Sequence, residues 1–233
     1  MALLGTAALA MWWDIAPQVR ADFEDWHAHE HFPERLALPG FRRGTRWSSA
    51  SGGEGMFVLY ELERHATLSS PGYVARLNAP TPWSTRLMPE HRNMVRAQCH
   101  VLESQGGVVA RHALTLRLSP AAGRAGELQT YFAALGPELG RRPGLTGVHL
   151  LRHEAPDMAA TTEQAIRGHA DARAEWVFIA CGYESSALES LGGAELAPDR
   201  LAAQGATPGR VEALYTLACS ALPTDVVEGR TPS

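Results

Sequence analysis

The sequence contains no lysine, and all 21 of its basic residues are arginine. Without a lysine amine, the protein cannot form a lysine Schiff base with a carbonyl compound. This excludes covalent pyridoxal-phosphate chemistry and class I aldolase chemistry. It also excludes a Walker A loop, in which a lysine contacts the phosphates of a nucleotide.

Cysteine is rare: Cys99, Cys181 and Cys219 are widely spaced, and each lies in an apolar run. An odd number of isolated cysteines is typical of reduced core residues in a cytoplasmic protein and argues against disulfides or a zinc knuckle. The patterns G-x-G-x-x-G, G-x-S-x-G and C-x-x-C are also missing. Dinucleotide binding, a serine-hydrolase elbow and dithiol chemistry therefore have no support.

Apolar runs long enough to span a bilayer are lacking as well. The first ten residues are apolar, but they have no basic start and continue directly into Met11-Trp12-Trp13-Asp14, so we predict a buried strand and not a signal peptide. The net charge of −4 argues against nucleic acid or an anionic membrane as partner. We therefore expect a cytoplasmic protein.

The 233 residues contain a weak internal repeat. Pro39-Gly40-Phe41 opens a predicted strand in the first half, and Pro143-Gly144-Leu145 opens one in the second. A strong strand follows each of them, at 56–62 and at 176–181. Other strands are predicted at 3–13, 93–102, 108–118 and 210–221, and helices at 17–37, 65–78, 124–139 and 186–204. The order β-α-β-β-α-β therefore occurs twice, which is the ferredoxin-like pattern in tandem.

Each ferredoxin-like unit has helices on one face of its sheet only, so the two bare faces must be covered. The predicted fold class is α+β, with two tandem units packed sheet to sheet. We expect the first unit at 1–104, the second at 105–222 and a disordered tail at 223–233. An insertion at 155–173 is predicted to be a mobile loop.

The predicted first helix has an unusual polar segment, which carries His27, His29, Glu30, His31 and Glu34. On a wheel of about 100° per residue, Val19, Phe23 and Trp26 mark the apolar face. His27, Glu30 and Glu34 fall on the same face. His31 lies at its edge and His29 roughly opposite. Burying an unpaired carboxylate costs several kcal/mol, so these groups are either paired or line a cavity.

The second half provides an internal control for this segment. Its corresponding helix has no histidine cluster, and its inner face can be filled by Leu128, Tyr131, Phe132, Leu135 and Leu139. One half is therefore predicted to have an ordinary packed core and the other a polar site. This comparison places the candidate site in residues 1–104.

Within that site, His27 is the candidate general base and Glu30 the carboxylate that orients it. His31 lies one turn beyond His27, so both can face one point. The alternatives are a core histidine bonded to a backbone carbonyl for His27 and a surface or interface histidine for His31. Glu34 is a candidate substrate contact or the partner of Arg35 in an ion pair.

A second polar cluster follows the proline-rich connection and consists of Asn78, Thr81, Trp83, His91, Arg92 and Asn93. Such donors suit the rim of a site. Arg92 could hold a substrate carboxylate or enolate by two parallel contacts, and its alternative is a surface salt bridge. Aromatic residues concentrate in the same half, and they would suit a flat or apolar substrate. They are Trp13, Trp26, Trp47, Tyr60 and Trp83.

Two cofactor alternatives stay open, although we expect neither a cofactor nor a metal. The run from His27 to His31 matches H-x-x-E-H, in which His27 and His31 would bind a divalent metal. A peptidase is disfavoured because Pro33 follows within two residues. A haem would need a proximal histidine in the second half, where His112 and His149 lie in strand patterns.

The motifs Trp26-His27-x-x-Glu30-His31-x-x-Glu34-Arg35-Leu36 and Pro39-Gly40-Phe41-x-x-Gly44-x-x-Trp47 resemble the dimeric α/β-barrel superfamily. The runs 76–83 and 88–94 extend the resemblance. It covers nearly the whole chain and is to the tandem single-chain form, with a first half similar to EthD-like and antibiotic-monooxygenase-like members. The resemblance implies a small-molecule protein. Relatives include cofactor-free monooxygenases, isomerases, decarboxylating enzymes, cyclases and haem proteins.

We therefore expect an enzyme without an organic cofactor that acts on an aromatic, polyketide-like or unsaturated carbonyl compound. His27 would abstract a proton, and His31, Asn78 or Arg92 would stabilise the resulting enolate. The alternative is a non-catalytic ligand-binding or dimer-forming protein, in which Glu30 and Glu34 pair with Arg42, Arg43 or Arg46. A monomer and a homodimer are both compatible with the repeat.

Overall fold

The computed structural model describes residues 3–53, 55–168 and 171–226. Its eight strands form a closed barrel in the order β1-β3-β2-β8-β5-β7-β6-β4, and all neighbouring strands are antiparallel. The first-half strands are β1 (Ala7–Asp14), β2 (Phe41–Ser49), β3 (Gly55–Leu62) and β4 (Arg92–Gly106). The second-half strands are β5 (His112–Leu118), β6 (Leu145–His153), β7 (Trp176–Gly182) and β8 (Val211–Ala221).

The two halves repeat one strand order. The first half reads β4-β1-β3-β2 and the second β8-β5-β7-β6, so in each the fourth strand lies beside the first. The β2–β8 and β4–β6 pairs join the halves. The predicted fold, two tandem ferredoxin-like units, is therefore confirmed, and the barrel closes within one chain.

Strand alternation separates two cores on β1. Ala8, Ala10 and Trp12 face the barrel interior, where they meet buried residues of both halves. Leu9 and Met11 face the opposite way, toward the helices of the first half. The outer face of this sheet is therefore where a site between sheet and helices can form.

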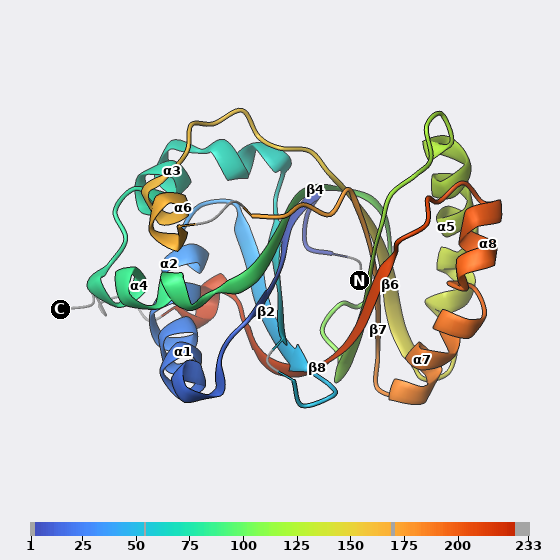
Figure 1. The fold of residues 1–233 in the computed structure, drawn as a ribbon, viewed down its shortest axis with the longest axis horizontal. Coiled ribbons are helices and arrows are strands. Elements are labelled where there is room, and N and C mark those ends of the chain that lie inside the picture. Colours follow the sequence, from blue (N-terminus) through green and yellow to red (C-terminus); the bar gives the residue numbers. More distant parts are fainter. Residues whose placement is uncertain (1–2, 54, 169–170, 227–233) are drawn as a thin grey trace.

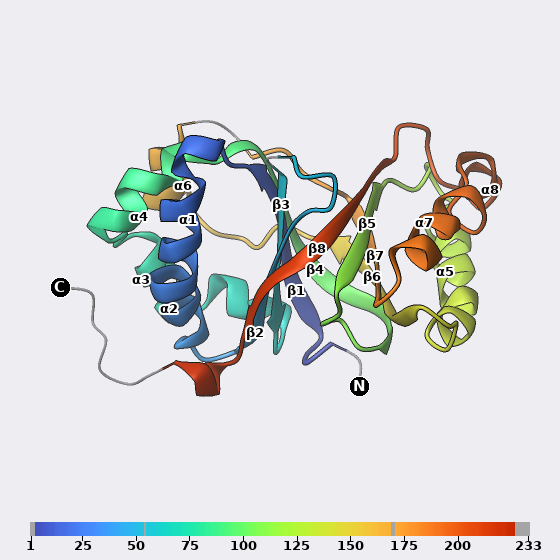
Figure 2. The same ribbon diagram turned by 90° about the horizontal axis from the view of Figure 1, so that it is seen from below.

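The helices lie at the two ends of the molecule (Figures 1 and 2). The first half is covered by α1 (Arg20–Trp26), a π-helix (His27–His31), α2 (Phe32–Leu36), α3 (Pro71–Leu77) and α4 (Pro82–Leu87). The second half is covered by α5 (Ala125–Leu139), α7 (Ser185–Gly193) and α8 (Pro198–Ala203). Short 3-10 turns occupy Pro17–Val19, His65–Ser69, Met88–Glu90 and Pro223–Asp225.

The second half has the packed core that the sequence predicts. Leu128, Phe132, Leu135 and Leu139 of α5 are buried against strands β5, β6 and β7, and Tyr131 is partly buried beside them. The described residues of α5 include no histidine, and the buried histidine of this half, His149, lies on β6. The two helical layers are thus chemically different, as the repeat comparison indicates.

The insertion predicted to be a mobile loop, at 155–173, contains regular structure in its described part. It contains α6 (Thr162–Arg167), which begins with a capping box between Thr161 and Gln164. The backbone N–H of Thr162 also donates a hydrogen bond of 3.0 Å to the amide oxygen of Asn78. In Figures 1 and 2, α6 lies among the first-half helices, although it belongs to the second half of the chain.

The chain ends and the end of β4 add three observations. The apolar N-terminal run forms the buried strand β1, as predicted. β4 continues to Gly106, past the expected boundary at residue 104. Pro223–Asp225 forms a turn that contacts α2 and β2, whereas 227–233 of the expected tail lies outside the described residues.

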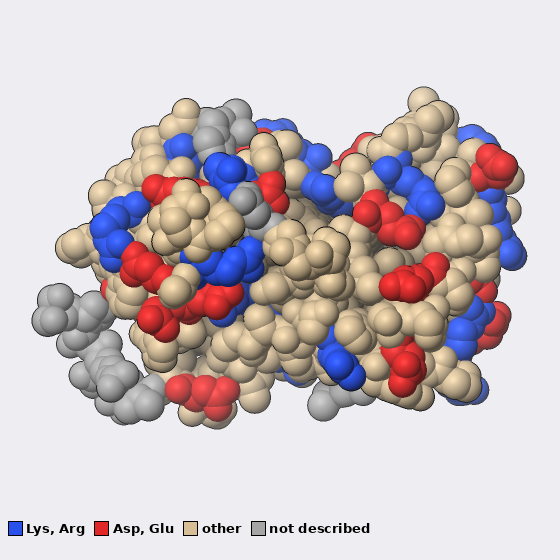
Figure 3. Space-filling model, turned by 60° about the horizontal axis from the view of Figure 1, so that its bottom comes forward, with Lys and Arg blue, Asp and Glu red and all other residues tan. Residues whose placement is uncertain are grey.

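Arginines and acidic residues are interspersed on the face in Figure 3.

Two further expectations concern cysteines and membranes. All three cysteines are free; Cys99 and Cys181 are buried and Cys219 is partly buried. Among the described residues, no helix has both the length and the apolar character needed to cross a bilayer.

Candidate functional site

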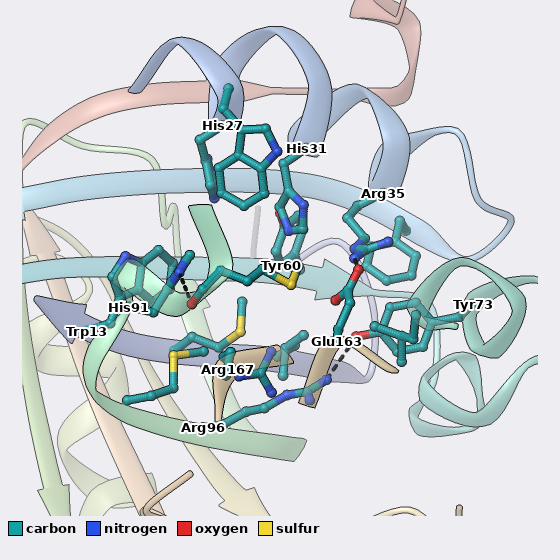
Figure 4. Close-up of a pocket in the computed structure, with 17 residues that line it drawn as sticks. Trp13, His27, His31, Arg35, Tyr60, Tyr73, His91, Arg96, Glu163 and Arg167 are labelled. Atoms are coloured by element: carbon teal, nitrogen blue, oxygen red, sulfur yellow. Dashed lines mark hydrogen bonds and ion pairs between the residues drawn. The ribbon is translucent and has the colours of Figure 1, made fainter. Parts of the chain in front are cut away.

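A cavity lies between the outer face of the first-half sheet and the helices that cover it (Figure 4). Its wall combines side chains of the sheet, of the π-helix and α2, and of α6. The labelled residues of the wall are Trp13, His27, His31, Arg35, Tyr60, Tyr73, His91, Arg96, Glu163 and Arg167. The volume of the cavity that water can enter is about 40 Å³, which is room for about three water molecules. A ligand must therefore displace water and shift part of the wall.

The π-helix decides which side chains reach the cavity. The i→i+5 bonding of a π-turn adds one residue to the turn, so all later positions shift by about one residue on the wheel. The faces predicted for Glu30 and Glu34 are therefore taken by His31 and Arg35, which line the cavity with His27. Phe32 and Pro33 then begin α2 without breaking the helix, because proline is tolerated in a first turn.

The imidazoles in the wall are neutral. Burial lowers the pKa of His27 and of His31 well below the usual value, and nearby arginines lower both further: Arg46 and Arg35 for His27, and Arg35 and Arg167 for His31. Burial likewise lowers the pKa of His91 to about 4. Each ring therefore carries one donor and one acceptor nitrogen at neutral pH.

Unpartnered polar atoms concentrate in this wall. Twelve buried side-chain nitrogen or oxygen atoms of the described residues have no hydrogen-bond partner, and six of these belong to residues of the cavity wall. These six are Nε1 of Trp13, Nδ1 of His27, Nδ1 of His31, the hydroxyl of Tyr60, Nε of Arg96 and Nε of Arg167. Buried polar groups are normally hydrogen-bonded. Six unpartnered polar atoms around one cavity therefore indicate a place for a ligand or water.

Three arginines give the cavity its electrostatic character. Arg35 forms a buried ion pair with Glu163 of α6. Arg167 forms one with Asp171, at 3.0 Å between Nη2 and Oδ2. Arg96 instead donates a hydrogen bond of 2.9 Å to the hydroxyl of Tyr73. No acidic side chain in the described part of the chain forms an ion pair with Arg96, which is 8% exposed.

Glu30 does not orient His27, which corrects the expectation from the wheel. Its Oε1 accepts hydrogen bonds from Nε1 of Trp26 at 3.0 Å and from the hydroxyl of Thr81 at 2.5 Å. The hydroxyl of Ser84 lies 3.4 Å away. Glu30 therefore fastens the π-helix to α4 and lies outside the cavity wall.

Glu34 also lies outside the cavity. It forms ion pairs with Arg35 and with Arg76 of α3, as the ion-pair alternative proposes. The three arginines considered as partners of Glu30 and Glu34 are engaged elsewhere. Arg42 pairs with Glu63, Arg43 pairs with Glu61, and Arg46 donates a hydrogen bond of 3.4 Å to the backbone oxygen of Glu24.

Other predicted residues are held away from the cavity. The indole of Trp83 donates to Asp22 at 2.9 Å, and the amide of Asn93 donates to Asp14 at 2.8 Å. Asn78 binds Thr162, as described above. Arg92 is exposed and is not part of the cavity wall, so it does not bind a ligand there.

Trp47 is buried in the barrel interior, where it stacks on Phe57. His29 points to solvent, as the wheel predicts.

For a metal, the described residues contain no group of three or more His, Cys, Asp or Glu side chains arranged to hold an ion. His27 and His31 do face each other, with ring centroids 5.3 Å apart, but Glu30 points away from them. The histidines considered for haem lie on strands of the second half. His149 is buried and contacts Ser104, and His112 contacts Thr216.

Sequence reasoning missed five polar residues of the wall: Arg35, Tyr73, Arg96, Glu163 and Arg167. Arg35 was hidden by the π-helix. Arg96 and Tyr73 could have been found, since Arg96 alternates with apolar residues on β4 and Tyr73 lies on the apolar face of α3. Glu163 and Arg167 gave no usable signal, because the sequence does not show that the insertion crosses to the other half.

Comparison with known proteins establishes the fold. No protein-family model matches the sequence, and no curated protein matches it in sequence. An anthrone oxidase-like protein of known structure has a TM-score of 0.63 at 9% identity, over 99% of both chains. A proposed monooxygenase from Fusobacterium nucleatum has a TM-score of 0.59 at 7% identity, over 94% of this chain and 96% of its own. Another, from Lactobacillus acidophilus, has 0.57 at 10%, over 94% and 97%. The chain thus shares the ferredoxin-like, dimeric α/β-barrel fold of monooxygenase-like proteins.

Proposed function

We propose that the protein is an enzyme that abstracts a proton from a small aromatic or unsaturated carbonyl compound and stabilises the resulting enolate. The observation that carries this proposal is the pair of neutral imidazoles, His27 and His31, whose Nδ1 atoms lack partners in a buried aromatic cavity. An unprotonated imidazole nitrogen in such a place is available to accept a proton.

The low pKa of these rings fits this role when a ligand is considered. Arg46 and Arg35 repel an imidazolium at His27. An enolate formed in the cavity attracts the imidazolium and offsets that repulsion, so proton transfer creates an ion pair and not an isolated charge. The ring is therefore a weak base in the empty cavity and a stronger one beside the developing anion.

The enolate oxygen needs hydrogen-bond donors that are not already engaged. The indole N–H of Trp13 and the hydroxyl of Tyr60 are such donors. Burial raises the pKa of Tyr60, so its hydroxyl stays protonated and can donate. These two groups replace Asn78 and Arg92 as the proposed oxyanion contacts. His31 and the positive field of the arginines complete the environment.

The class of substrate is proposed from the wall and from the likeness to known structures. Phe41, Tyr73 and Trp26 present flat apolar surfaces, which suit a planar substrate. An enolate is electron-rich and can reduce molecular oxygen, and the anthrone oxidase-like neighbour favours oxidation over isomerisation, decarboxylation or cyclisation. Membership in the EthD-like group of the tandem superfamily is part of the same proposal.

A ligand-binding protein without turnover is the second candidate. Neutralisation of Glu34 by Arg35 and Arg76 favours it, since that pairing needs no chemistry. In either case a monomer is proposed, because each half pairs its outer strands with the other half, and the barrel leaves no edge strand open.

Exchange of the acidic C–H protons of anthrone in D₂O, followed by NMR, tests the enzymatic proposal. We expect the wild-type protein to accelerate exchange over buffer and His27→Gln or His31→Gln to reduce that acceleration at least tenfold. His29→Gln is the matched control, because His29 is exposed on the same π-helix, and should keep the wild-type rate. Wild-type exchange at the buffer rate, or equal rates for all variants, would overturn the proposal.

A further inference from the structure

A second cavity adjoins the first at α6 and Arg96. Glu163 and Arg167 of α6 line the first cavity, whereas Gln164 of the same helix lines the second. Arg96 of β4 belongs to both walls. The centres of water molecules can occupy about 300 Å³ of the second cavity, so it is much roomier than the first. The two cavities are therefore neighbours that differ in size.

The chemical character of the second cavity is also different. Among the described residues, its wall has no aromatic ring other than that of His153 and consists mainly of polar side chains: Arg96, Gln98, His153, Gln164, Asp171 and Arg173, with Ala160. A space lined largely by aromatic rings and a space lined by polar side chains thus share one arginine.

Two arginines in this wall have no carboxylate partner among the described residues. Arg96 is buried and uses one Nη2 contact to Tyr73, while its Nε is unpartnered. Arg173 is exposed and forms no ion pair with a described residue. Asp171, which is the one carboxylate among the described residues of the wall, is already engaged by Arg167. The space therefore carries an excess of positive charge with free donors, which is the chemistry that recognises a carboxylate.

We propose that the second cavity binds a carboxylate carried by the substrate, so that the substrate is an aromatic acid whose ring enters the first cavity. Arg96 and Arg173 hold the carboxylate, and the ring lies against Trp13, Trp26 and Tyr60. This inference rests on the proposed function, since it assigns the ring to that site.

Binding of 3-phenylpropanoate and of 3-phenylpropanamide, followed by quenching of tryptophan fluorescence, tests this inference. The two compounds differ only in the terminal group, which is an anionic carboxylate in the first and a neutral amide in the second. We expect the carboxylate to bind at least about tenfold more tightly than the amide to the wild-type protein, because hydrogen bonds to charged groups are the stronger ones. Arg173→Gln should weaken the carboxylate about threefold or more and leave the amide unchanged.

Arg111→Gln is the matched control, because Arg111 is exposed and precedes β5 at the end of that strand away from Arg117 and Arg173. It removes the same charge and should leave both affinities unchanged. Sodium acetate distinguishes a free-anion site: it should fail to displace 3-phenylpropanoate at equal concentration, and equal affinity of acetate would overturn the link between the cavities.

The remaining outcomes separate this inference from the proposed function. Equal binding of acid and amide, unaffected by Arg173→Gln, overturns the carboxylate site and leaves the aromatic site standing. Binding of neither compound overturns the inference whatever the exchange assay with anthrone shows. Loss of anthrone exchange in the wild type, with selective acid binding intact, contradicts the enzymatic proposal alone.

Discussion

Arg35 of α2 and Glu163 of α6 form a buried ion pair although they are 128 residues apart in the sequence. The pair joins the first half of the chain to an insertion in the second half, directly at the wall of the cavity. The candidate site is therefore assembled from both repeats, and not from the first half alone as the sequence comparison indicates.

The first prediction concerns this pair. Glu163→Gln removes the nearer of the two carboxylates that pair with buried Arg35 and leaves only Glu34, at 3.5 Å and shared with Arg76, so we expect the free energy of unfolding to fall by about 3 kcal/mol. Urea denaturation followed by circular dichroism measures it. Glu63→Gln removes a carboxylate from a pair whose side chains are 44–49% exposed and should cost less than about 1 kcal/mol. Equal losses of unfolding free energy in the two variants would contradict a buried ion pair between α2 and α6.

The second prediction is a loss of stability in weak acid. His27, His31, His91 and His149 have pKa values lowered by burial, to about 4 for His91 and His149. The unfolded chain therefore binds more protons below its histidine pKa of about 6.5, so stability is full above that pH and falls as the pH is lowered toward 4.

Urea midpoints measured from pH 7.5 to pH 5 check this dependence, because carboxylates titrate mostly below that range. His91→Gln should flatten the curve, whereas His29→Gln should not, since His29 is exposed. A midpoint that stays constant down to pH 5 would show that these rings are not buried in the neutral form.

The third prediction distinguishes Glu30 from a catalytic carboxylate. Glu30→Ala removes the acceptor for Trp26 and Thr81, and we expect a loss of about 2 kcal/mol of stability. Glu30→Gln keeps an acceptor oxygen and should retain anthrone exchange within about threefold. A folded Glu30→Gln protein that does not accelerate anthrone exchange would contradict this assignment and support the predicted role of Glu30 in orienting His27.

The sequence predicts the strands and the fold class well, because the period-2 patterns and the Pro-Gly-x strand openings occur at equivalent places in both halves. It identifies His27, His31, Trp13, Trp26, Tyr60 and His91 as neighbours in one site. It fails where one residue changes the geometry. Because the π-helix adds one residue to a turn, His31 and Arg35 take the cavity-facing positions that the wheel assigns to Glu30 and Glu34. The hydrophobic periodicity of the sequence does not reveal this extra residue.

Long-range placement is the second source of failure. Arg92 and Arg96 lie on the same strand, four residues apart, yet only Arg96 reaches the cavity. The position of α6 depends on ion pairs and hydrogen bonds to α2 and Asn78, which local patterns do not reveal.

Tyr60→Phe tests the central claim most directly, namely that the unpartnered polar atoms of the cavity serve a ligand. The substitution removes a buried hydroxyl that has no hydrogen-bond partner, so the free energy of unfolding should stay within about 1 kcal/mol of wild type or increase. Loss of one oxyanion donor should lower the rate of anthrone exchange by about 100-fold. A destabilised Tyr60→Phe protein that exchanges anthrone at the wild-type rate would contradict the account.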